Sequence, residues 1–267
     1  MDGIETLIRD ELVVVRHDVN LGFGRACNKG AGVGVAELVL FLNPDACLRP
    51  DSLNPVIARL GKSENANVAV FGVKLIDSNG KIWRTCARLP SPTSMCVMTL
   101  GIDRLFPIKC PSYVMSEWDH ATTRFVDHVI GAFYLIRRRA FESMRGFDED
   151  YFVYLEDLDL SYRLCKAGWR SLYVAEATAY HAGGGSSQQI RARRLAYSVR
   201  SRLVFVRKHF QLGSRVLVST LSLVVEPLIR LTVATCRADW ATVKNTFGGY
   251  AMLYAALVPK IIGSGAK

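Results

Sequence analysis

Residues 12–45 decide the predicted fold and read LVVVRHDVNLGFGRACNKGAGVGVAELVLFLNPD. Leu12–Val15 is rich in β-branched residues and predicts a strand, and Asn20–Gly24 supplies a glycine-rich turn. Arg25–Val35 has the alanine and glycine content of a short, closely packed helix, and Glu37–Leu42 is a second apolar run. Strand, turn, helix and strand make one βαβ unit. The stretch therefore predicts an α/β fold with a parallel sheet, whose ligands bind at the carboxyl ends of the strands.

The rest of the chain continues this alternation. Further strands are expected at Val68–Val73, in the mostly extended stretch Phe125–Arg137 and at Trp169–Val174, and helices at Pro50–Leu60, Arg138–Met144 and Glu156–Ala167. Ser78-Asn79-Gly80 predicts a hairpin turn between two short extended runs. Residues 86–124 contain four prolines and predict an irregular surface excursion, where an acceptor loop could lie.

The composition indicates a globular chain in a reducing compartment. Half of the 267 residues are hydrophobic, and the length suits one large domain with a short appendage. The seven cysteines are scattered without CxxC spacing, which argues against a disulfide framework or a zinc knuckle. The first residues carry acids among the apolar positions and lack the apolar region of a signal peptide. We therefore expect the protein to stay in the cytoplasm.

Positive charge is concentrated in the C-terminal part of the chain. The net charge is +10, and residues 188–267 contain 13 Lys or Arg against Glu226 and Asp239. This segment carries no recognisable nucleic-acid motif, and its bases are interleaved with apolar residues, so we expect an anionic membrane surface as partner and no nucleic acid. The chain divides accordingly into a domain at residues 1–187 and a basic, apolar helical tail at residues 188–267.

The tail alternates basic and apolar segments. A basic helix is expected at Ile190–Phe210, followed by apolar stretches at residues 216–233 and 247–263. Glu226 interrupts the first stretch and Lys260 the second before either reaches ~20 apolar residues, the length of a membrane span. Amphipathic, interfacial helices fit this pattern better than membrane spans do. The alternative is that these are ordinary core helices.

Asn43-Pro44-Asp45 follows the second apolar run and is the first candidate ligand site. At the carboxyl end of a buried strand, the Asp45 carboxylate would project into the crevice where ligands bind. A hard cation such as Mg²⁺ needs only one or two carboxylates besides substrate phosphates and water. The alternative is a plain strand-ending turn, since Asn, Pro and Asp all favour turns.

Three carboxylates crowd the start of the helix expected at Glu156–Ala167. They are Glu156, Asp157 and Asp159, and leucines separate them. A helix N-terminus favours carboxylates through its free N–H groups and its dipole, so helix capping explains one or two of them. Apolar surface beside a carboxylate can raise its pKa toward the working range of a general base. On these residues alone, capping and catalysis both stay open.

His181 stands between an apolar strand and the glycine run Gly183–Ser187. A neutral imidazole can bind a metal or a phosphate, and a glycine-rich backbone can present N–H groups to an anion. The alternative is a purely structural histidine. The turn Asn20–Gly24 also looks like a degenerate phosphate loop, but it lacks the G-x-G-x-x-G and Walker spacings. Only its place after the first expected strand indicates contact with a nucleotide.

Taken in order, these motifs closely resemble family 2 glycosyltransferases, especially their rhamnosyltransferase-like branch. The resemblance covers roughly residues 2–210 and rests on NxGFGxAxNxG from Asn20, LFLNPD ending at Asp45, GAFxLIRR from Gly131, GFDE from Gly146, EDxDL from Glu156, KAGW from Lys166 and HxGGGS from His181. It implies a GT-A-like, Rossmann-like mixed sheet flanked by helices. By the same resemblance the strands that hold the nucleotide base would precede Met1, so the fold would be truncated at its N-terminus.

The resemblance implies an inverting transfer of a sugar, with rhamnose as one candidate, from a nucleotide-diphospho-sugar to a hydroxyl of a cell-surface glycan or a lipid-linked acceptor. Asp157 matches the catalytic base, and Glu156 would orient it or the acceptor. Asp45 stands at the family's DXD position, reduced here to a single aspartate. His181 matches a histidine that can complete the site of a divalent metal, Mg²⁺ or Mn²⁺. The reaction requires no covalent sugar–enzyme intermediate.

The same resemblance assigns the remaining contacts. The expected donor-binding residues are Asn20, Gly22, Phe23, Arg25, Asn28, Asn43 and Asp45, and the expected acceptor-binding residues are Gly131, Ala132 and Asp159. The protein would work in the cytoplasm, peripheral on the inner face of the cell membrane. Two alternatives stay open. One is a catalytically inactive, truncated, membrane-peripheral remnant of such an enzyme, and the other is a metal-dependent phosphohydrolase, because paired acids, a histidine and glycines suit that chemistry too.

Overall fold

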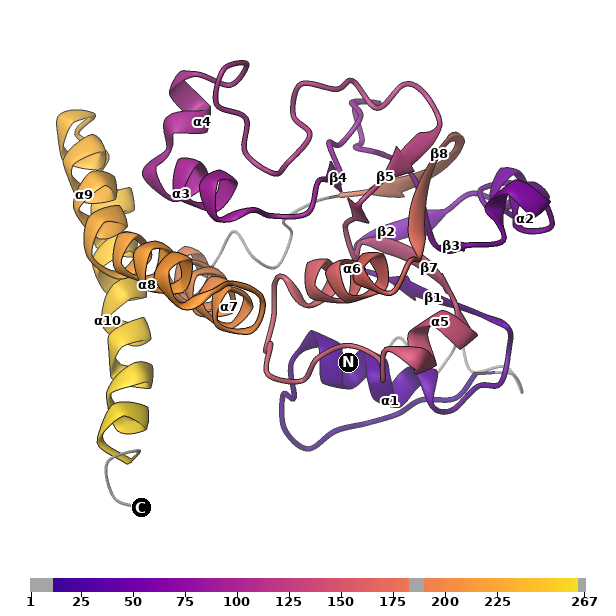
Figure 1. Cartoon of the computed structure of the whole chain (residues 1–267), viewed down its shortest axis with the longest axis horizontal. Helices are drawn as coiled ribbons and strands as arrows, with labels where there is room; N and C mark the ends of the chain where they lie inside the picture. Colours follow the sequence, from indigo (N-terminus) through magenta and orange to yellow (C-terminus); the bar gives the residue numbers. More distant parts are fainter. Residues whose placement is uncertain (1–11, 183–189, 264–267) are drawn as a thin grey trace.

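The computed structural model describes residues 12–182 and 190–263 and centres on one mixed β-sheet (Figure 1). Its strands lie in the order β1-β7-β3-β8-β2, and β5 also pairs with β8. They span Leu38–Leu42 (β1), Ala46–Leu48 (β2), Val68–Ile76 (β3), Arg124–Val126 (β5), Phe133–Arg137 (β7) and Arg170–His181 (β8). Helices flank this sheet, which confirms the predicted mixed α/β architecture.

The strand directions differ from the parallel arrangement expected from residues 12–45. β3 and β8 run parallel, but β7 is antiparallel to β1 and β3, and β2 and β5 are antiparallel to β8. The expected βαβ unit is wrong, because Leu12–Val15 forms no strand and its side chains are 42–66 % exposed. A β-branched run becomes a strand where a neighbouring strand binds its backbone and covers one face. No strand lies beside Leu12–Val15 within the described residues.

Helices cover both faces of the sheet, with α1 (Phe23–Ala31), α5 (Arg138–Ser143) and α6 (Glu156–Lys166) on one face and α2 (Asn54–Leu60) on the other. The side chains of β7 alternate between these two apolar layers. Tyr134 and Ile136 pack in the layer of α6, whereas Phe133 and Leu135 pack in the layer of α2. This alternation follows from the two-residue period of a strand. Burial on both faces explains why the central strands read as continuous apolar runs.

Residues 86–124 are more regular than their prolines suggested. They contain β4 (Cys86–Ala87), which pairs with β6 (His128–Val129), and the helices α3 (Pro92–Leu100) and α4 (Ile102–Leu105). Ser91 and Ser94 form a capping box, in which each hydroxyl accepts the backbone N–H of the other residue. Pro92 stands in the first helical turn, where no partner for an N–H is needed. The expectation of a wholly irregular excursion is therefore wrong.

The C-terminal part is helical, as expected (Figure 1). It comprises α7 (Arg191–His209), α8 (Leu212–Thr220), a π-helical turn (Leu221–Val225), α9 (Glu226–Cys236) and α10 (Trp240–Gly263). The continuous segment Leu212–Cys236 is long and apolar enough to cross a membrane, by length and composition alone. Glu226 does not break it, because the structure buries this carboxylate against the guanidinium of Arg202. The expected domain boundary between residues 187 and 188 lies outside the described residues.

Candidate functional site

The end of β1, the turn before β7 and the start of α6 meet at one end of the sheet. The Asn43 N–H donates to the Ala132 carbonyl oxygen (3.1 Å), and the N–H of neighbouring Gly131 donates to Oδ2 of Asp157 (2.6 Å). Ala132 therefore contacts the end of β1, beside Asp45, and the adjacent Gly131 contacts Asp157 at the start of α6. Gly131 and Ala132 make these contacts through their backbones, and the acceptor contacts expected of them stay predictions.

Asp45 and His181, which were predicted to share a site, lie side by side. β2 and β8 pair so that Ala46 lies opposite His181, and the Ala182 N–H donates to the Asp45 carbonyl oxygen (3.0 Å). Nε2 of His181 lies 3.3 Å from Oδ1 of Asp45. His181 is 9 % exposed, and neither of its buried ring nitrogens has a hydrogen-bond partner among residues 12–182 and 190–263. An imidazole in this state can accept a further ligand.

This pair of side chains fits a divalent cation. Carboxylate oxygens suit Mg²⁺ and Mn²⁺, and imidazole binds many divalent transition metals. Within residues 12–182 and 190–263, no three His, Cys, Asp or Glu side chains gather as a metal site. The described part of the protein would therefore contribute Asp45 and His181, with phosphate oxygens and water completing the shell. Gly183–Ser187, the glycine run expected to contact an anion, lies outside the described residues.

The first turn of α6 presents two carboxylates in different surroundings. Asp157 is partly exposed, and its Oδ1 accepts the Leu158 N–H (2.8 Å). Glu156 is 6 % exposed, and its buried Oε2 has no hydrogen-bond partner within the described residues. Burial, and then the charge of Asp157, raises the pKa of Glu156 to about 8. Helix capping explains the bond to Leu158 but not the burial of Glu156, which at neutral pH holds a proton.

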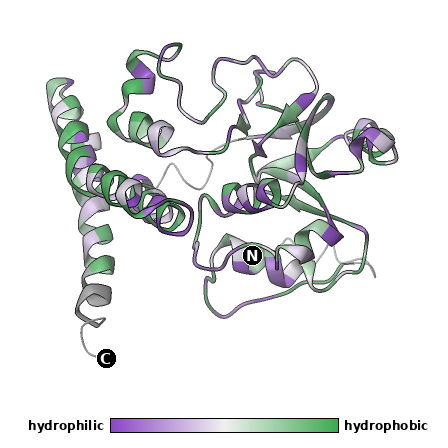
Figure 2. Ribbon diagram, in the orientation of Figure 1, coloured by the Kyte–Doolittle hydropathy of each residue, from purple (hydrophilic) through white to green (hydrophobic). Residues whose placement is uncertain are grey.

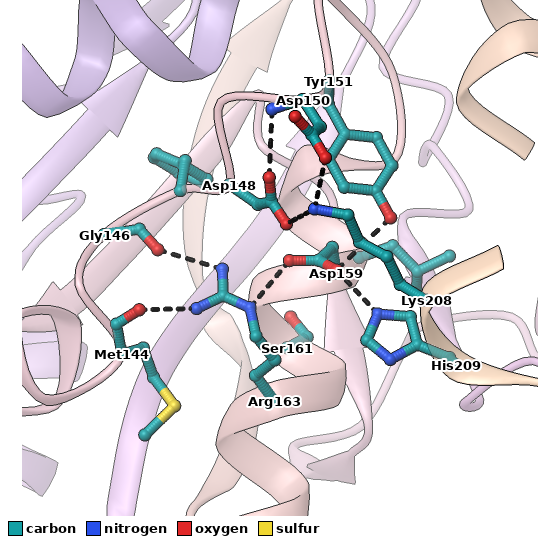
Figure 3. A network of polar contacts seen from close by, with 12 residues as sticks. Met144, Gly146, Asp148, Asp150, Tyr151, Asp159, Ser161, Arg163, Lys208 and His209 are labelled. Carbon is teal, nitrogen blue, oxygen red and sulfur yellow. Dashed lines mark hydrogen bonds and ion pairs between the residues drawn. The ribbon is translucent and has the colours of Figure 1, made fainter. Parts of the chain in front are cut away.

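Asp159 is fully buried on the inner side of α6 (Figure 3). Its carboxylate accepts hydrogen bonds from the Tyr151 hydroxyl (3.3 Å), from Arg163 Nε (2.7 Å) and from His209 Nε2 (2.7 Å). Burial acts to raise the pKa of Asp159, but the hydrogen bonds from His209 and Arg163 outweigh it, and the pKa is lowered. The acceptor contact predicted for Asp159 is not supported by this burial. The residue anchors α6 to the end of α7.

Two residues predicted to bind the donor hold α1 against the loop between α5 and α6. Nδ2 of Asn28 donates to the Phe147 carbonyl oxygen (2.9 Å), and its Oδ1 accepts the Phe147 N–H (2.8 Å). Arg25 forms an exposed ion pair with Glu149 (3.2 Å). Both side chains therefore have partners within the protein, and those of Asn28 explain the choice of an amide at this position.

The turn before α1 is shaped by close packing. Gly22 has φ +87°, and a Cβ there would lie 2.2 Å from the Phe152 carbonyl oxygen, which accepts the Phe23 N–H (2.9 Å). Only glycine fits such a position. A Cβ at Gly24 would lie 3.8 Å from the Cβ of Glu156, so the turn ends beside that buried carboxyl. Donor contacts remain predictions for Asn20, Gly22, Phe23, Arg25, Asn28 and Asn43.

A histidine that was not predicted as a site residue lies behind Asp157. His128 is buried, and its Nε2 lies 3.8 Å from Oδ2 of Asp157. Its Nδ1 lies 3.0 Å from the Ser161 hydroxyl, which in turn lies 3.0 Å from the Tyr134 hydroxyl. A titratable residue inside a largely apolar extended stretch, just before Gly131, is the sequence signal that could have revealed it.

Residues 38–259 match the protein family described as "Glycosyl transferase family group 2". Among curated proteins, the chain is 30 % identical over 206 residues to the N-acetylglucosaminyl-diphospho-decaprenol L-rhamnosyltransferase of Mycobacterium tuberculosis, a match that covers 70 % of this chain and 64 % of that protein. It is 31 % identical over 148 residues to the rhamnosyltransferase WbbL of Escherichia coli K12, which covers 54 % of this chain and 52 % of that protein.

Two solved structures show weaker overall similarity. A mannosyltransferase from Pyrobaculum calidifontis, in complex with GDP-Man and Mn²⁺, aligns with a TM-score of 0.46 at 15 % identity and covers 95 % of this chain and 61 % of that one. GalNAc-T7 with UDP, GalNAc and Mn²⁺ aligns with a TM-score of 0.44 at 15 % identity, covering 73 % and 38 %. The chain spans less than two thirds of the length of the curated relatives it matches. The family match extends over most of the chain and confirms the resemblance seen in its motifs, so this protein belongs to family group 2 of the glycosyl transferases.

Proposed function

We propose that this protein is a glycosyltransferase that moves a sugar from a nucleotide-diphospho-sugar to a hydroxyl group, with inversion at the anomeric carbon. The observation that carries the proposal is the backbone connection between Asp157 and the strand end that carries the Asp45–His181 pair. One end of the sheet therefore holds a carboxylate that can accept a proton. The same end holds two side chains suited to binding a cation together with a diphosphate. Membership of the family supports this chemistry.

Asp157 would act as the general base. As the acceptor oxygen attacks the anomeric carbon from the face opposite the diphosphate, its proton passes to the Asp157 carboxylate and the bond from the sugar to the nucleoside diphosphate breaks. The hydrogen bond from the Gly131 N–H to Oδ2 (2.6 Å) orients this carboxylate. Attack and departure occur on opposite faces, so one displacement inverts the configuration.

Glu156 would position a reactant rather than accept the proton. With a pKa of about 8 it is protonated at neutral pH, so it can donate a hydrogen bond. Its Oε2 has no partner within the described residues and lies near the start of α1. A hydroxyl of the donor or of the acceptor would satisfy this buried carboxyl group.

Asp45 and His181 would hold the divalent metal, Mg²⁺ or Mn²⁺. Two features support this assignment: the buried ring nitrogens of His181 have no hydrogen-bond partner within the described residues, and a carboxylate oxygen of Asp45 lies 3.3 Å from one of them. When bound, such an ion supplies positive charge that stabilises the leaving diphosphate.

The names of the relatives suggest the substrate class. The mycobacterial relative is named for rhamnosyl transfer to N-acetylglucosaminyl-diphospho-decaprenol, and the Escherichia coli relative is named a rhamnosyltransferase. We propose rhamnose, or a closely related deoxyhexose, as the sugar and a lipid-linked glycan as the acceptor. An acceptor of this kind is held in a membrane, so the enzyme would work at a membrane surface.

The C-terminal helices support a peripheral location on the cytoplasmic face of the cell membrane. Their exposed apolar side chains include Leu212, Val216, Leu217, Val224, Leu228, Val233, Trp240 and Phe247. In Figure 2 the ribbon of these C-terminal helices carries many residues coloured as hydrophobic. Ordinary core helices would bury such side chains. Anionic lipid offers apolar burial together with attraction for the basic residues of the same segment.

Acceptor-dependent release of nucleoside diphosphate from a panel of nucleotide sugars tests the proposal. With the full chain, Mn²⁺ and a polyprenyl-diphospho-N-acetylglucosamine acceptor, we expect release from one donor and a product of opposite anomeric configuration by NMR. Release that needs no acceptor would favour the phosphohydrolase. Failure to release from any donor would favour the inactive remnant.

A further inference from the structure

Three buried polar side chains form a series that leads to Asp157. His128 in β6, Tyr134 in β7 and Ser161 in α6 are each less than 5 % exposed, at 4 %, 0 % and 1 %. The Tyr134 hydroxyl lies 3.0 Å from Oγ of Ser161, which lies 3.0 Å from Nδ1 of His128. Nε2 of His128, at the other side of the ring, lies 3.8 Å from Oδ2 of Asp157.

The need of each buried polar group for a hydrogen-bond partner indicates which atom donates in each bond of this series. Burial raises the pKa of Tyr134, so its hydroxyl keeps its proton, and among the described residues Ser161 is the acceptor within reach. Ser161 can then donate its own proton to Nδ1 of His128. A neutral imidazole that accepts at Nδ1 carries its proton on Nε2, the nitrogen that faces Asp157. The reverse direction would leave the buried Tyr134 hydroxyl without an acceptor, which is unfavourable.

The surroundings of His128 favour its neutral form. Burial lowers the pKa of His128, and the charges of Asp157 and Asp127 only partly oppose this. The titratable groups facing this pair are Glu156 on α6, Tyr113 after α4, Tyr134 on β7 and Asp127 before β6. None of these four supplies positive charge. Oδ2 of Asp157 accepts the Gly131 N–H, and Nε2 of His128 lies 3.8 Å from the same oxygen.

We propose that His128, held by Ser161 and Tyr134, is a positioning residue that directs its Nε2–H to Asp157 and keeps that carboxylate oriented for proton transfer. The distance of 3.8 Å is longer than a hydrogen bond, and a shift of about 1 Å closes it. Catalytic hydrogen bonds often tighten in this way once substrate is bound. The catalytic part of this inference rests on the proposed function, whereas the contact itself does not.

Variants at His128 separate a hydrogen-bonding role from packing. His128→Gln keeps a donor N–H on a side chain of similar length, whereas His128→Leu removes the donor. Because a lost donor disfavours the charged form, His128→Leu should raise the pKa of Asp157 by about half a unit or more. The acidic limb of the pH–kcat profile should move upward by the same amount. We expect kcat to fall about tenfold with little change in KM for the donor, and His128→Gln to lie closer to the parent.

Carbon-13 NMR titration of the carboxyl groups measures the pKa of Asp157 without requiring activity, with Asp157→Asn assigning the signal. If the parent shows no transfer but Asp157 titrates at higher pH in His128→Leu, the proposed function fails and the contact stands. An unchanged pKa of Asp157 in folded His128→Leu would overturn the inference.

Ser161→Ala provides the test if His128→Leu does not fold. It removes the hydrogen bond that orients the imidazole, so the pKa of Asp157 should rise in the same direction. Ser52→Ala is the matched control, because Ser52 is also a buried serine but donates to the Thr178 carbonyl oxygen, away from Asp157. A pKa of Asp157 that is equal in Ser161→Ala and Ser52→Ala would contradict the proposed role.

Discussion

Asp45 and His181 reach each other through the pairing of β2 with β8, which brings a carboxylate oxygen to 3.3 Å from an imidazole nitrogen. Neither ring nitrogen has a hydrogen-bond partner among the described residues, and a buried polar group left in this state costs folding free energy. A bound cation would remove this cost, which supports the proposal that His181 is a metal ligand.

Asp45→Ala and His181→Ala should each weaken the binding of Mn²⁺ to the full chain, because each removes one ligand of the same shell. The effects should be less than additive in the double variant. Titration of Mn²⁺ by calorimetry measures the affinities. Asp51→Ala, at an exposed carboxylate nearby, is the matched control and should bind as the parent does. Unchanged affinity in both single variants, or full transfer activity in excess chelator, would contradict the assignment.

Glu156 makes the stability of the protein depend on pH. Its pKa is raised from 4.5 to about 8 in the folded state, so its contribution is fully present below pH 4.5 and is lost as the pH rises through 8. Glu156→Gln keeps the shape of the protonated form and does not titrate. The unfolding free energy of the parent should therefore fall relative to that of Glu156→Gln between pH 5 and pH 8, by at most about 1.4 kcal/mol per unit of pH. Urea unfolding measures this, and a difference independent of pH would show that the pKa is not raised.

At the scale of elements, α6 is held in place by the last residues of α7 (Figure 3). His209 donates to the buried Asp159, and Lys208 forms ion pairs with Asp148 and Asp150 in the loop that precedes α6. The helix that carries Asp157 is thereby fixed to the C-terminal helices. Movement of those helices on a membrane would be transmitted to the candidate base through these contacts.

His209→Ala should destabilise the protein by about 1–3 kcal/mol, because it removes a donor from a carboxylate that is fully buried. Arg207→Ala is the matched control on the same turn of α7. Its ion pair with Asp150 is about half exposed, so its loss should cost no more than about 1 kcal/mol. Equal effects of the two changes on the free energy of unfolding in urea would contradict the anchoring role of Asp159.

The sequence predicts those elements in which burial in the core determines the pattern of apolar residues. Apolar runs predicted strands at Val68–Val73 and Trp169–Val174, and the structure extends them to Val68–Ile76 and Arg170–His181. The helix predicted at Glu156–Ala167 is α6. Leu12–Val15 has the composition of a strand but no neighbour in the described residues, and composition cannot show whether a partner exists. Ser91 and Ser94 signal the start of α3, but the prolines around them indicated irregular structure.

The candidate site was predictable only in part. Asp45, Asp157 and His181 were proposed from the order and spacing of the motifs, but the strand register that places His181 opposite Ala46 cannot be read from the sequence. His128 is a titratable residue in a largely apolar stretch, but this signal does not show that its side chain faces Asp157. Buried polar contacts of this kind depend on packing between elements that are distant in the sequence.

At the scale of the whole molecule, charge and exposed apolar surface gather in the C-terminal helices, where 13 basic residues stand against two acidic ones in residues 188–267. We expect the full chain to bind anionic vesicles in a salt-sensitive way, at about 1 kcal/mol per basic residue near the surface, and neutral vesicles more weakly. Vesicle sedimentation at low and high salt measures this.

Two double variants test which surface binds the vesicles. Leu217→Ser with Leu228→Ser should weaken binding, because both exposed leucines lie on the C-terminal helices. Val33→Ser with Val35→Ser is the matched control, since these valines are also exposed, Val35 at 94 %, but lie between α1 and β1. Equal binding to neutral and anionic vesicles at low salt, or equal loss in both double variants, would contradict a membrane role for the tail.

The assignment of Asp157 as the general base is tested most directly by the rate of acceptor-dependent nucleoside diphosphate release from Asp157→Asn, compared with the parent and with Asp51→Asn. Asparagine keeps the shape of the side chain but cannot take the proton, so release should fall by about 10²–10⁴-fold while folding and donor binding are retained. Asp51→Asn should release at the parent's rate, because this exposed carboxylate lies outside the site. Release by Asp157→Asn within about threefold of the parent would contradict the account.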